Sequence, residues 1–258
     1  MTELSRGREP VLLLHGQPGG ARDWDRVIAG LGGRAQTIAI DRPGWDERGG
    51  GLDLAGNAAA AVAALDGAGV GRATIVGHSF GAAVAAWLGA SRPQHVARLV
   101  LLAPAANTAS LQWIDRWLAA PILGPLLSGV AVGGPGVALA LPPVRRSLAS
   151  RLQVDAAYLQ AVGRALRRPS ATRTFLVEQR AVVSQLPALE ARLPEISAPT
   201  TIVIGSADRI VPPFSAKLLA GQIRGAALVP IRGAGHLLAM HHADQIAALA
   251  LGGGGSQS

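Results

Sequence analysis

Short apolar runs alternate with helical stretches along most of the chain. The runs of four to six residues are typical of buried strands, and they span Val11 to Leu14, Ala35 to Ile40, Ala73 to Val76, Arg98 to Leu102, Thr200 to Ile204 and Ala227 to Ile231. Helices are expected over Trp24 to Leu31, Asn57 to Leu65, Phe80 to about Ala90, Ser215 to Gln222 and His242 to Leu251. This alternation predicts an α/β fold, a doubly wound, mostly parallel sheet of about six strands with helices on both faces.

One turn between a strand and a helix carries a recognisable chemical pattern. Gly77-His78-Ser79-Phe80-Gly81 directly follows the third apolar run. G-x-S-x-G is typical of a nucleophile elbow, whose tight bend projects the serine hydroxyl from the end of the sheet. Side chains at the two glycine positions would collide with the neighbouring strand and helix. Because the chain has 33 glycines, the pattern needs support from residues at other strand ends, where ligands bind in such sheets.

Two later strands are followed by an acid and a base. Asp208 comes after Thr200 to Ile204, and His236 lies in a small-residue loop after Ala227 to Ile231. An imidazole titrates near neutral pH, so His236 can take the proton of Ser79 and return it to a leaving group. Aspartate is also common in turns, which is the alternative role of Asp208. We predict the catalytic set Ser79, Asp208 and His236.

The first strand is followed by the glycine-rich segment His15-Gly16-Gln17-Pro18-Gly19-Gly20. A loop there can direct a backbone N–H at the substrate of the serine. The expected oxyanion donors are the N–H groups of Gln17 and Phe80. The alternative is a Pro-Gly turn with a structural histidine.

The remaining histidines have weaker positions. His241 and His242 are rivals of His236, but they are expected at the start of the last helix. His78 is expected to point away from the site within the sharp turn, and His95 precedes a strand.

The order serine, acid, histidine, each directly after a strand, belongs to one triad architecture. Here the sequence resembles the α/β-hydrolase superfamily, in its serine-nucleophile branch, from about Val11 to Leu251. The resemblance rests on HGQPGG, on Asp41-Arg42-Pro43-Gly44, on GHSFG, and on GSADRIVPP with GAGH. It implies that Arg42 ties neighbouring loops together. Serine at the elbow differs from haloalkane dehalogenases and epoxide hydrolases, which use a carboxylate there.

The chain also departs from many members of that superfamily. Only ten residues precede the first strand, so the usual leading hairpin is expected to be missing or reduced. The loop Trp45-Asp46-Glu47-Arg48 lacks the glycine-containing pattern of many relatives.

The interval between the fourth and fifth strands is far longer than one crossover helix. The resemblance implies a helical cap over residues 106–199, inserted into a core of residues 1–105 and 200–251. Trp113 and Trp117 lie four apart, on one helical face, and we predict that they contact substrate. Residues 252–258 are predicted to be a flexible Gly-rich tail.

Trp117 to Leu141 contains no charged residue in 25 positions. We expect this run to form the interior of the cap. The alternative is an apolar lid that lines an acyl or aryl pocket and touches a membrane or lipid surface. The run is long enough to span a membrane, but its three prolines and five glycines disfavour a span.

Composition excludes several other classes. With 49% hydrophobic and 16% charged residues, the chain is not disordered. It has no cysteine, so it has no thiolate metal site and no thiol nucleophile.

The formal charge of +8 comes almost entirely from scattered arginines. Aromatic residues for base stacking are sparse, so no nucleic-acid partner is expected. Arg164, Arg167, Arg168 and Arg173 are expected to form a solvated face. The polar start predicts a cytoplasmic location.

These observations predict a serine hydrolase that acts by acyl transfer on a small to medium, mostly apolar ester, without a metal or organic cofactor. A small-molecule substrate is the expected partner. The same triad also serves carbon-carbon bond hydrolases and cofactor-free perhydrolases, and a binding protein on a hydrolase scaffold is a third class. Fold resemblance does not choose among these functions.

Overall fold

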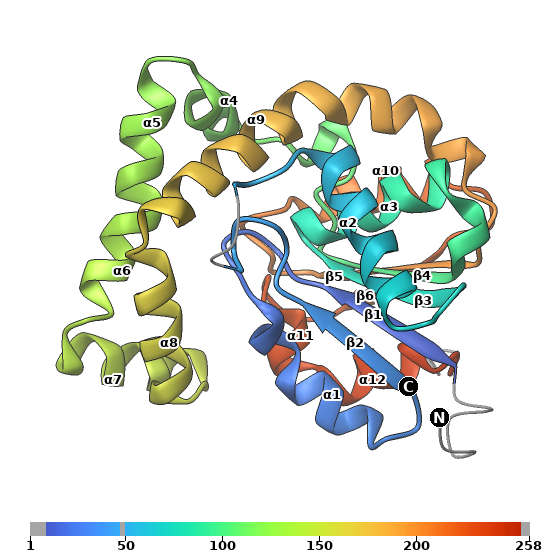
Figure 1. Cartoon of the computed structure of the whole chain (residues 1–258), viewed down its shortest axis with the longest axis horizontal. Coiled ribbons are helices and arrows are strands. Elements are labelled where there is room, and N and C mark those ends of the chain that lie inside the picture. Colours follow the sequence, from blue (N-terminus) through green and yellow to red (C-terminus); the bar gives the residue numbers. More distant parts are fainter. Residues whose placement is uncertain (1–8, 47–49, 254–258) are drawn as a thin grey trace.

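A six-stranded parallel sheet forms the centre of the protein (Figure 1). The computed structural model describes residues 9–46 and 50–253. The strand order is β2-β1-β3-β4-β5-β6, and every neighbouring pair is parallel. The strands are β1 (Pro10–Leu14), β2 (Gln36–Ile40), β3 (Ala73–His78), β4 (Val96–Leu102), β5 (Thr200–Gly205) and β6 (Ala227–Ile231). The predicted fold class is confirmed.

Helices cover both faces of the sheet (Figure 1). On one face, α1 (Asp25–Leu31) packs against α12 (Ala243–Ala250), and on the other α2 (Leu54–Gly67) packs against α3 (Phe80–Ser91). The remaining core helices are α10 (Pro213–Gln222) and α11 (Leu238–His241). Short 3-10 helices are η2 (Ala21–Trp24), η3 (Pro93–His95), η4 (Thr108–Ser110) and η6 (Leu193–Glu195).

Capping and backbone geometry explain where helices differ from the prediction. α2 begins three residues earlier than expected, because the Asp53 side chain accepts a hydrogen bond from Gly56 N at 2.8 Å and caps the first turn. The expected last helix, His242 to Leu251, is observed as α12 and begins one residue later, because His242 has a non-helical ψ of 35°. Glu47 and Arg48 of the atypical loop, and residues 254–258 of the predicted tail, lie outside the described residues.

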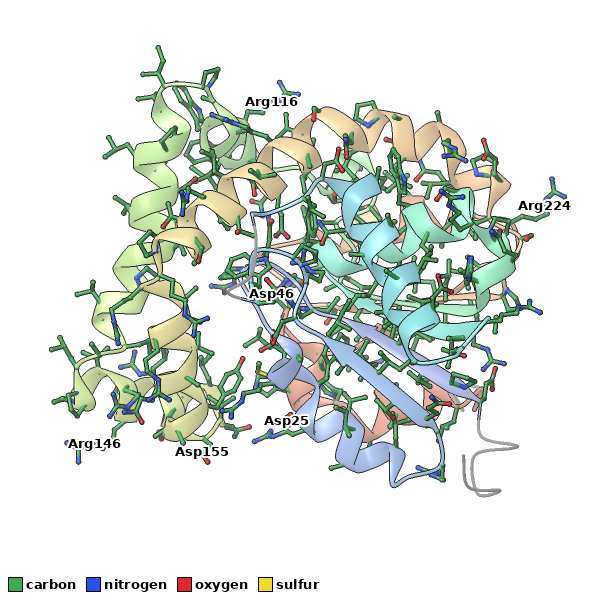
Figure 2. All side chains as sticks on the ribbon, viewed as in Figure 1. Asp25, Asp46, Arg116, Arg146, Asp155 and Arg224 are labelled. Atoms are coloured by element: carbon green, nitrogen blue, oxygen red, sulfur yellow. The ribbon has the colours of Figure 1, made fainter. Side chains whose placement is uncertain are left out.

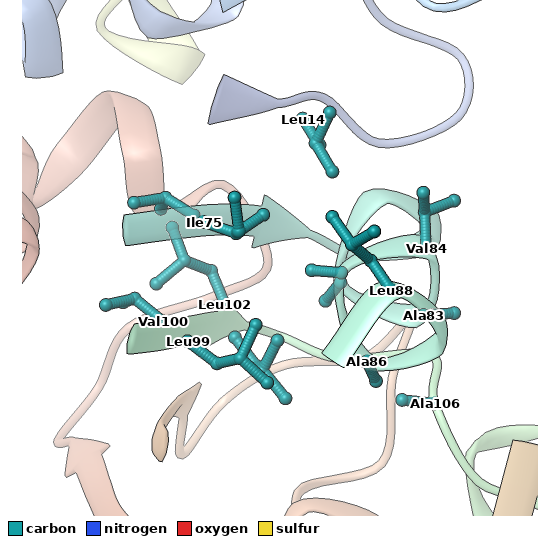
Figure 3. Close-up of a cluster of buried hydrophobic side chains, with 14 of the residues drawn as sticks. Leu14, Ile75, Ala83, Val84, Ala86, Leu88, Leu99, Val100, Leu102 and Ala106 are labelled. Carbon is teal, nitrogen blue, oxygen red and sulfur yellow. The ribbon is translucent and has the colours of Figure 1, made fainter. Parts of the chain in front are cut away.

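The main core lies between the sheet and its helices. Leu14, Ile75 and Leu99 from three strands pack with Val84 and Leu88 of α3 (Figure 3). α3 is buried on nearly all sides, which fits a helix that is apolar all round. This close packing holds the carboxyl ends of β1, β3 and β4 side by side, where the site is built.

The segment between β4 and β5 is helical, and most of it lies to one side of the core (Figure 1). Its helices are α4 (Trp113–Ala119), α5 (Leu123–Ser128), the π-helical turn η5 (Gly129–Gly133), α6 (Gly134–Ala138), α7 (Pro142–Leu152), α8 (Ala156–Leu166) and α9 (Pro169–Arg192). The second half of α9 contributes Val182, Leu186 and Leu189 to the main core. The hydrophobic packing of this cap segment therefore passes into the core within α9, before residue 199.

The charge-free run Trp117 to Leu141 is mostly on the surface, so its expected place in the cap interior is wrong. A narrow stripe of mainly small residues at four-residue spacing, Gly124, Ser128, Val132 and Gly136, is buried. An added Cβ at Gly124 or Gly136 would meet α9 or α8 at 3.1 Å or less. Leu139 is also buried, against Ala149 of α7 and Leu159 of α8. Most of the other side chains of the run face outward because few positions pack against the neighbouring helices.

Among residues 9–46 and 50–253, no single helix is long and apolar enough to cross a membrane. Trp113–Ala119 and Leu123–Ala138 meet the length and composition criteria only as a pair, and the pair bends by 107°.

Candidate active site

Ser79 stands on a strained turn between β3 and α3. Its φ of 54° and ψ of −116° lie outside the regions that L-residues favour. The turn is held in place by hydrogen bonds, because Ser79 N donates to Leu102 O at 2.9 Å and Ser79 O accepts from Ala82 N at 3.0 Å. Backbone strain of this kind persists where the surrounding structure fixes it. The geometry is that of the predicted nucleophile elbow.

The two elbow glycines are required by close backbone approach. A Cβ on Gly77 would collide with the carbonyl oxygen of Gly81. A Cβ on Gly81 would collide with the carbonyl oxygen of Leu14, at the end of β1. The steric role predicted for both glycines is confirmed.

Asp208 and His236 are joined at the carboxyl ends of β5 and β6. His236 Nδ1 lies 2.8 Å from Asp208 Oδ2, and Asp208 Oδ1 accepts from the N–H groups of Ile210 at 2.8 Å and Val211 at 3.0 Å. Burial alone would raise the pKa of Asp208, but the hydrogen bonds from His236 and the two amides outweigh it and hold the pKa below its ordinary value. Asp208 is therefore an anion that orients the His236 ring.

The structure brings Ser79 and His236 to one cavity. Both line a space of about 260 Å³ beside Gly16 and Tyr158. Within the described part of the chain, no hydrogen bond joins the Ser79 hydroxyl to His236. Such bonds often tighten only when substrate is present.

His78 packs against His236, so the expectation that it points away from the site is wrong. Its Nε2 donates to His236 O at 2.9 Å, and the two rings lie 4.7 Å apart between centroids. Burial, followed by the neighbouring His236, lowers the pKa of His78 to about 3. A neutral His78 thus supports the backbone of His236. His241 binds Leu152 O at 2.8 Å instead.

The loop after β1 lies against the elbow. A Cβ added to Gly16 would stand 3.2 Å from Ser79 Cβ. Gln17 and Phe80 line a second cavity with Ser79, of about 380 Å³. Among the described residues, the backbone N–H of Gln17 donates to no acceptor. Phe80 is the first residue of α3, so its backbone N–H has no acceptor within the helix. Both predicted oxyanion donors therefore lie beside the serine.

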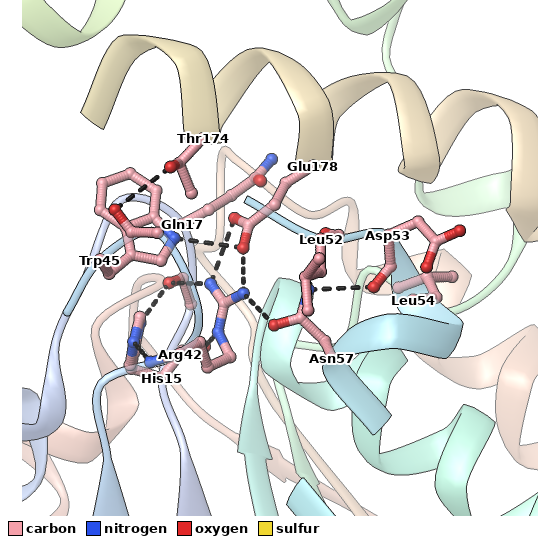
Figure 4. A network of polar contacts seen from close by, with 12 residues as sticks. His15, Gln17, Arg42, Trp45, Leu52, Asp53, Leu54, Asn57, Thr174 and Glu178 are labelled. Carbon is pink, nitrogen blue, oxygen red and sulfur yellow. Dashed lines mark hydrogen bonds and ion pairs between the residues drawn. The ribbon is translucent and has the colours of Figure 1, made fainter. Parts of the chain in front are cut away.

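Arg42 ties the loops around the site together, as the resemblance implied (Figure 4). Its guanidinium donates to His15 O and to Gly16 O, both at 2.9 Å, and to Asn57 Oδ1 at 3.2 Å. His15 Nε2 accepts from Arg42 N at 2.9 Å. Burial, followed by the Arg42 charge, holds the pKa of His15 well below its ordinary value. A neutral His15 and a buried Arg42 thus set the course of the oxyanion loop.

The same arginine binds the cap segment. Arg42 forms an ion pair with Glu178 of α9, and both side chains are buried. Trp45 Nε1 donates to Glu178 Oε1 at 3.1 Å (Figure 4). A second link runs from Gln17 Nε2 to Gln179 Oε1 at 2.8 Å. Gln179 Nε2 in turn donates to Asp115 Oδ1 of α4 at 2.8 Å.

Trp113 and Trp117 lie outside both cavities at Ser79. They are 74% and 50% exposed, and neither lines a cavity beside the serine. The residue after each, Ile114 and Leu118, lines the larger cavity. On α4, the side chains of Ile114 and Leu118 face the cavity, whereas Trp113 and Trp117 face outward. This placement gives no support to substrate contact by the two tryptophans.

A half-buried acid beside the site was not predicted. Asp23 accepts from Tyr158 of α8 at 2.7 Å and from Gly20 N at 3.1 Å, and it lines the cavity that His236 lines. Burial raises the pKa of Asp23 to about 6. Nothing in the sequence around Asp23 indicates this role, because its partner Tyr158 comes from the cap. Among the described residues, no group of His, Cys, Asp or Glu is arranged to hold a metal ion.

The fold agrees with the comparisons to known proteins. A model described as the alpha/beta hydrolase family matches residues 11–249, and the chain belongs to that family and is a hydrolase. It is 29% identical to a 2-hydroxy-6-oxononadienedioate/2-hydroxy-6-oxononatrienedioate hydrolase of Pseudomonas putida, over 96% of this chain and 88% of that protein. It is 28% identical to a pimeloyl-[acyl-carrier protein] methyl ester esterase of Neisseria meningitidis, over 93% and 91%.

A solved structure shares the fold. A thermophilic esterase from Thermogutta terrifontis superposes with a TM-score of 0.72 at 20% identity, over 93% of this chain and 87% of that one.

Proposed function

We propose that this protein hydrolyses a small to medium, mostly apolar carboxylic ester by acyl transfer through Ser79. One observation carries the proposal. The strained serine lies between a cavity that His236 lines, with Asp208 bonded to the His236 ring, and a cavity that Gln17 and Phe80 line. This arrangement supports one role in acyl transfer for each group.

In the first half-reaction, Ser79 Oγ attacks the ester carbonyl carbon and His236 Nε2 takes its proton. The oxyanion accepts hydrogen bonds from the N–H groups of Gln17 and Phe80. His236 then gives the proton to the leaving oxygen, which departs as the alcohol. Asp208 holds the Nδ1–H tautomer throughout.

In the second half-reaction, water enters at the His236 side. His236 takes a proton from the water, and the resulting hydroxide attacks the acyl carbon. The tetrahedral intermediate collapses, Ser79 recovers its proton from His236, and the acid is released.

The lining of the larger cavity supports an apolar acyl group. Its apolar lining comes from the core and from α4 and α9: Phe80, Ala105, Leu111, Ile114, Leu118, Phe175, Val182, Ile210 and Val211. About 380 Å³ falls at the lower end of small-molecule sites, which hold roughly 300 to 1,000 Å³. Because the leaving oxygen must face His236, the smaller cavity is placed for the alcohol part.

A carbon-carbon bond hydrolase is the second candidate. The Pseudomonas putida relative, by its name, acts on a dioate, a substrate with two carboxylates. Among the described residues that line the two cavities, Arg209 is the one permanently cationic side chain, whereas Asp23 and Asp115 are acidic. This balance favours a neutral ester over a dianion.

A substrate panel tests the proposal. Initial rates are measured on p-nitrophenyl acetate, butyrate and octanoate and on 2-hydroxy-6-oxononadienedioate. We expect kcat/KM on the best ester to exceed that on the dioate by at least about 100-fold, the discrimination that an unpaired polar or charged group in a site can give. A higher kcat/KM on the dioate would establish the second candidate instead.

A variant pair locates the acyl cavity. Leu118→Trp fills the larger cavity and should lower kcat/KM on the octanoate at least about tenfold relative to the acetate. Leu218→Trp, on an exposed position of α10, is the matched control and should leave the ratio unchanged. Equal ratios in both variants would contradict the assignment of this cavity to the acyl group.

A further inference from the structure

The cap segment presents a large apolar surface to the outside. We define the outer cap face as the exposed side chains Trp113, Trp117, Ile122, Leu126, Val130, Val137 and Leu141. Ile122 is 88% exposed and Trp113 is 74% exposed. Figure 2 shows hydrocarbon side chains that project outward from α5, away from the core. Exposed apolar side chains gathered on consecutive helices in this way indicate an interaction site.

The packing inside the cap leaves this face uncovered. The buried stripe Gly124, Ser128, Val132 and Gly136 already uses the inner side of α5 to α6. The inner side of α4 is used as well, because Ile114 and Leu118 line the cavity at Ser79. Within residues 9–46 and 50–253, no segment covers the outer cap face.

Arginines border the outer cap face. Arg180 Nε donates to Ala119 O at 3.2 Å, Arg167 Nη1 to Gly136 O at 2.9 Å, and Arg145 Nη1 to Leu139 O at 3.1 Å. These bonds hold three cationic side chains from neighbouring elements against the helices that carry the face. Figure 2 shows Arg116 at one end of the cap segment and Arg146 at the other.

Acidic side chains are fewer than arginines in the cap segment. Trp117 to Leu141 contains no acid, and residues 106–199 hold ten arginines and five acids. Asp115, the nearest acid in sequence, is turned inward, where it accepts from Gln112 N at 2.7 Å and from Gln179 at 2.8 Å. The complementary partner is apolar in its interior and negatively charged at its surface.

We infer that the outer cap face docks on the surface of a bilayer that contains anionic lipids. Tryptophans at 74% and 50% exposure suit the boundary between headgroups and acyl chains, where amphipathic rings gather. Arginines around an apolar face are typical of helices that lie in the plane of the interface. A second copy of the chain fits less well, because a two-fold contact would bring the same arginines together.

The docked geometry has a consequence for the site. α4 carries the outer tryptophans on one side and two lining residues of the larger cavity on the other. A bilayer against the outer cap face would therefore lie one helix away from the acyl cavity. The docking inference itself does not depend on which bond the enzyme cleaves.

Vesicle flotation tests the inference directly. The Ser79→Ala protein is mixed with vesicles of phosphatidylcholine, or of phosphatidylcholine with about a third phosphatidylglycerol, at about 0.1 M and 0.5 M salt. We expect flotation with the anionic vesicles, which weakens at the higher salt. Since this variant lacks the proposed nucleophile, binding is measured apart from turnover.

Surface variants assign the binding to the outer cap face. Ile122→Ser/Leu126→Ser should weaken vesicle binding at least about tenfold, from lost apolar burial. Arg116→Gln/Arg146→Gln should weaken it about 25-fold, at about fivefold for each cation. Phe214→Ser/Leu218→Ser, exposed at 59% and 51% on α10 of the core, is the matched control. Circular dichroism and p-nitrophenyl acetate turnover, the latter with Ser79 present, confirm that each variant folds.

Three results would overturn the inference. The first is no flotation with anionic vesicles at low salt. The second is a loss of binding in Phe214→Ser/Leu218→Ser equal to that in Ile122→Ser/Leu126→Ser. The third is a dimer, detected by light scattering, that Ile122→Ser/Leu126→Ser dissociates, which would make the face an interface between two copies of this chain.

Discussion

The buried ion pair between Arg42 and Glu178 joins the oxyanion loop to the cap segment, and removing one partner should be costly. Both side chains are at most 1% exposed. Arg42→Met leaves the Glu178 charge with only the Trp45 N–H, and it also removes the bonds to His15 O and Gly16 O. Breaking a buried pair on one side typically costs about 3–5 kcal/mol.

The double variant separates the pair from its surroundings. Glu178→Gln keeps the side-chain shape, and we expect it to lower the free energy of unfolding by about 3 kcal/mol. Arg42→Met/Glu178→Gln holds no buried charge, so its loss should be at least about 2 kcal/mol smaller than the sum of the single losses. With total stabilities of about 5–15 kcal/mol, the single variants should still fold.

Urea denaturation followed by circular dichroism measures these losses. The exposed pair Arg192 and Glu195, at 3.0 Å with side chains 36% and 52% exposed, provides the control, and its variants should change stability by no more than about 1 kcal/mol. If the double variant loses the sum of the two single losses in free energy of unfolding, within about 0.5 kcal/mol, the expected coupling is refuted. The two residues would then not act as a buried unit.

Three further predictions concern the site. Asp208→Asn should lower kcat about 10⁴-fold with little change in KM, because the His236 ring loses its orienting anion; steady-state rates test this, and a loss below tenfold would contradict it. Gly16→Ala places a Cβ 3.0 Å from His78 Nδ1 and 3.2 Å from Ser79 Cβ and should lower kcat about 100-fold through the displaced Gln17 amide, whereas Gly71→Ala, with no atom within 4 Å, should not. The pKa of Asp23 is raised from 3.8 to about 6 in the folded protein, so the folded state binds this proton more tightly than the unfolded state, and stability should fall as pH rises from about 4 to 6. Asp23→Asn should remove this fall, worth about 3 kcal/mol at about 1.4 kcal/mol per pKa unit, and melting temperatures across that range that match the wild type would refute the assignment.

The catalytic candidates could be predicted because their placement depends on local sequence. Each follows an apolar strand, and parallel strands bring their carboxyl ends to one edge of the sheet. Ser79, Asp208 and His236 are therefore brought to that edge independently of how the cap segment folds. The elbow glycines carried their own steric signal, which the contacts of Gly77 and Gly81 confirm.

The partners supplied by the cap segment could not be predicted in the same way. Glu178 and Gln179 lie in a long helix whose sequence does not state which core loop it will face. Tyr158 likewise meets Asp23 across 135 residues of chain. These contacts depend on how the cap helices fold back over the core, which no short pattern specifies.

The apolar run Trp117 to Leu141 was misjudged because hydrophobicity does not say which partner will cover a surface. Four of its five buried positions, Gly124, Ser128, Val132 and Gly136, are mostly small and recur at intervals of four. That spacing was available in the sequence and indicates a narrow helical contact. The larger side chains between them were the ones left outside.

The central claim is that Ser79 forms the acyl-enzyme, and active-site labelling tests it most directly. The wild type and Ser79→Ala are treated with a fluorophosphonate, and intact mass and peptide mapping locate the adduct. We predict one adduct per chain, on Ser79, and none in Ser79→Ala, together with loss of ester hydrolysis in that variant. An adduct on another residue, or unchanged ester hydrolysis by Ser79→Ala, would contradict the account.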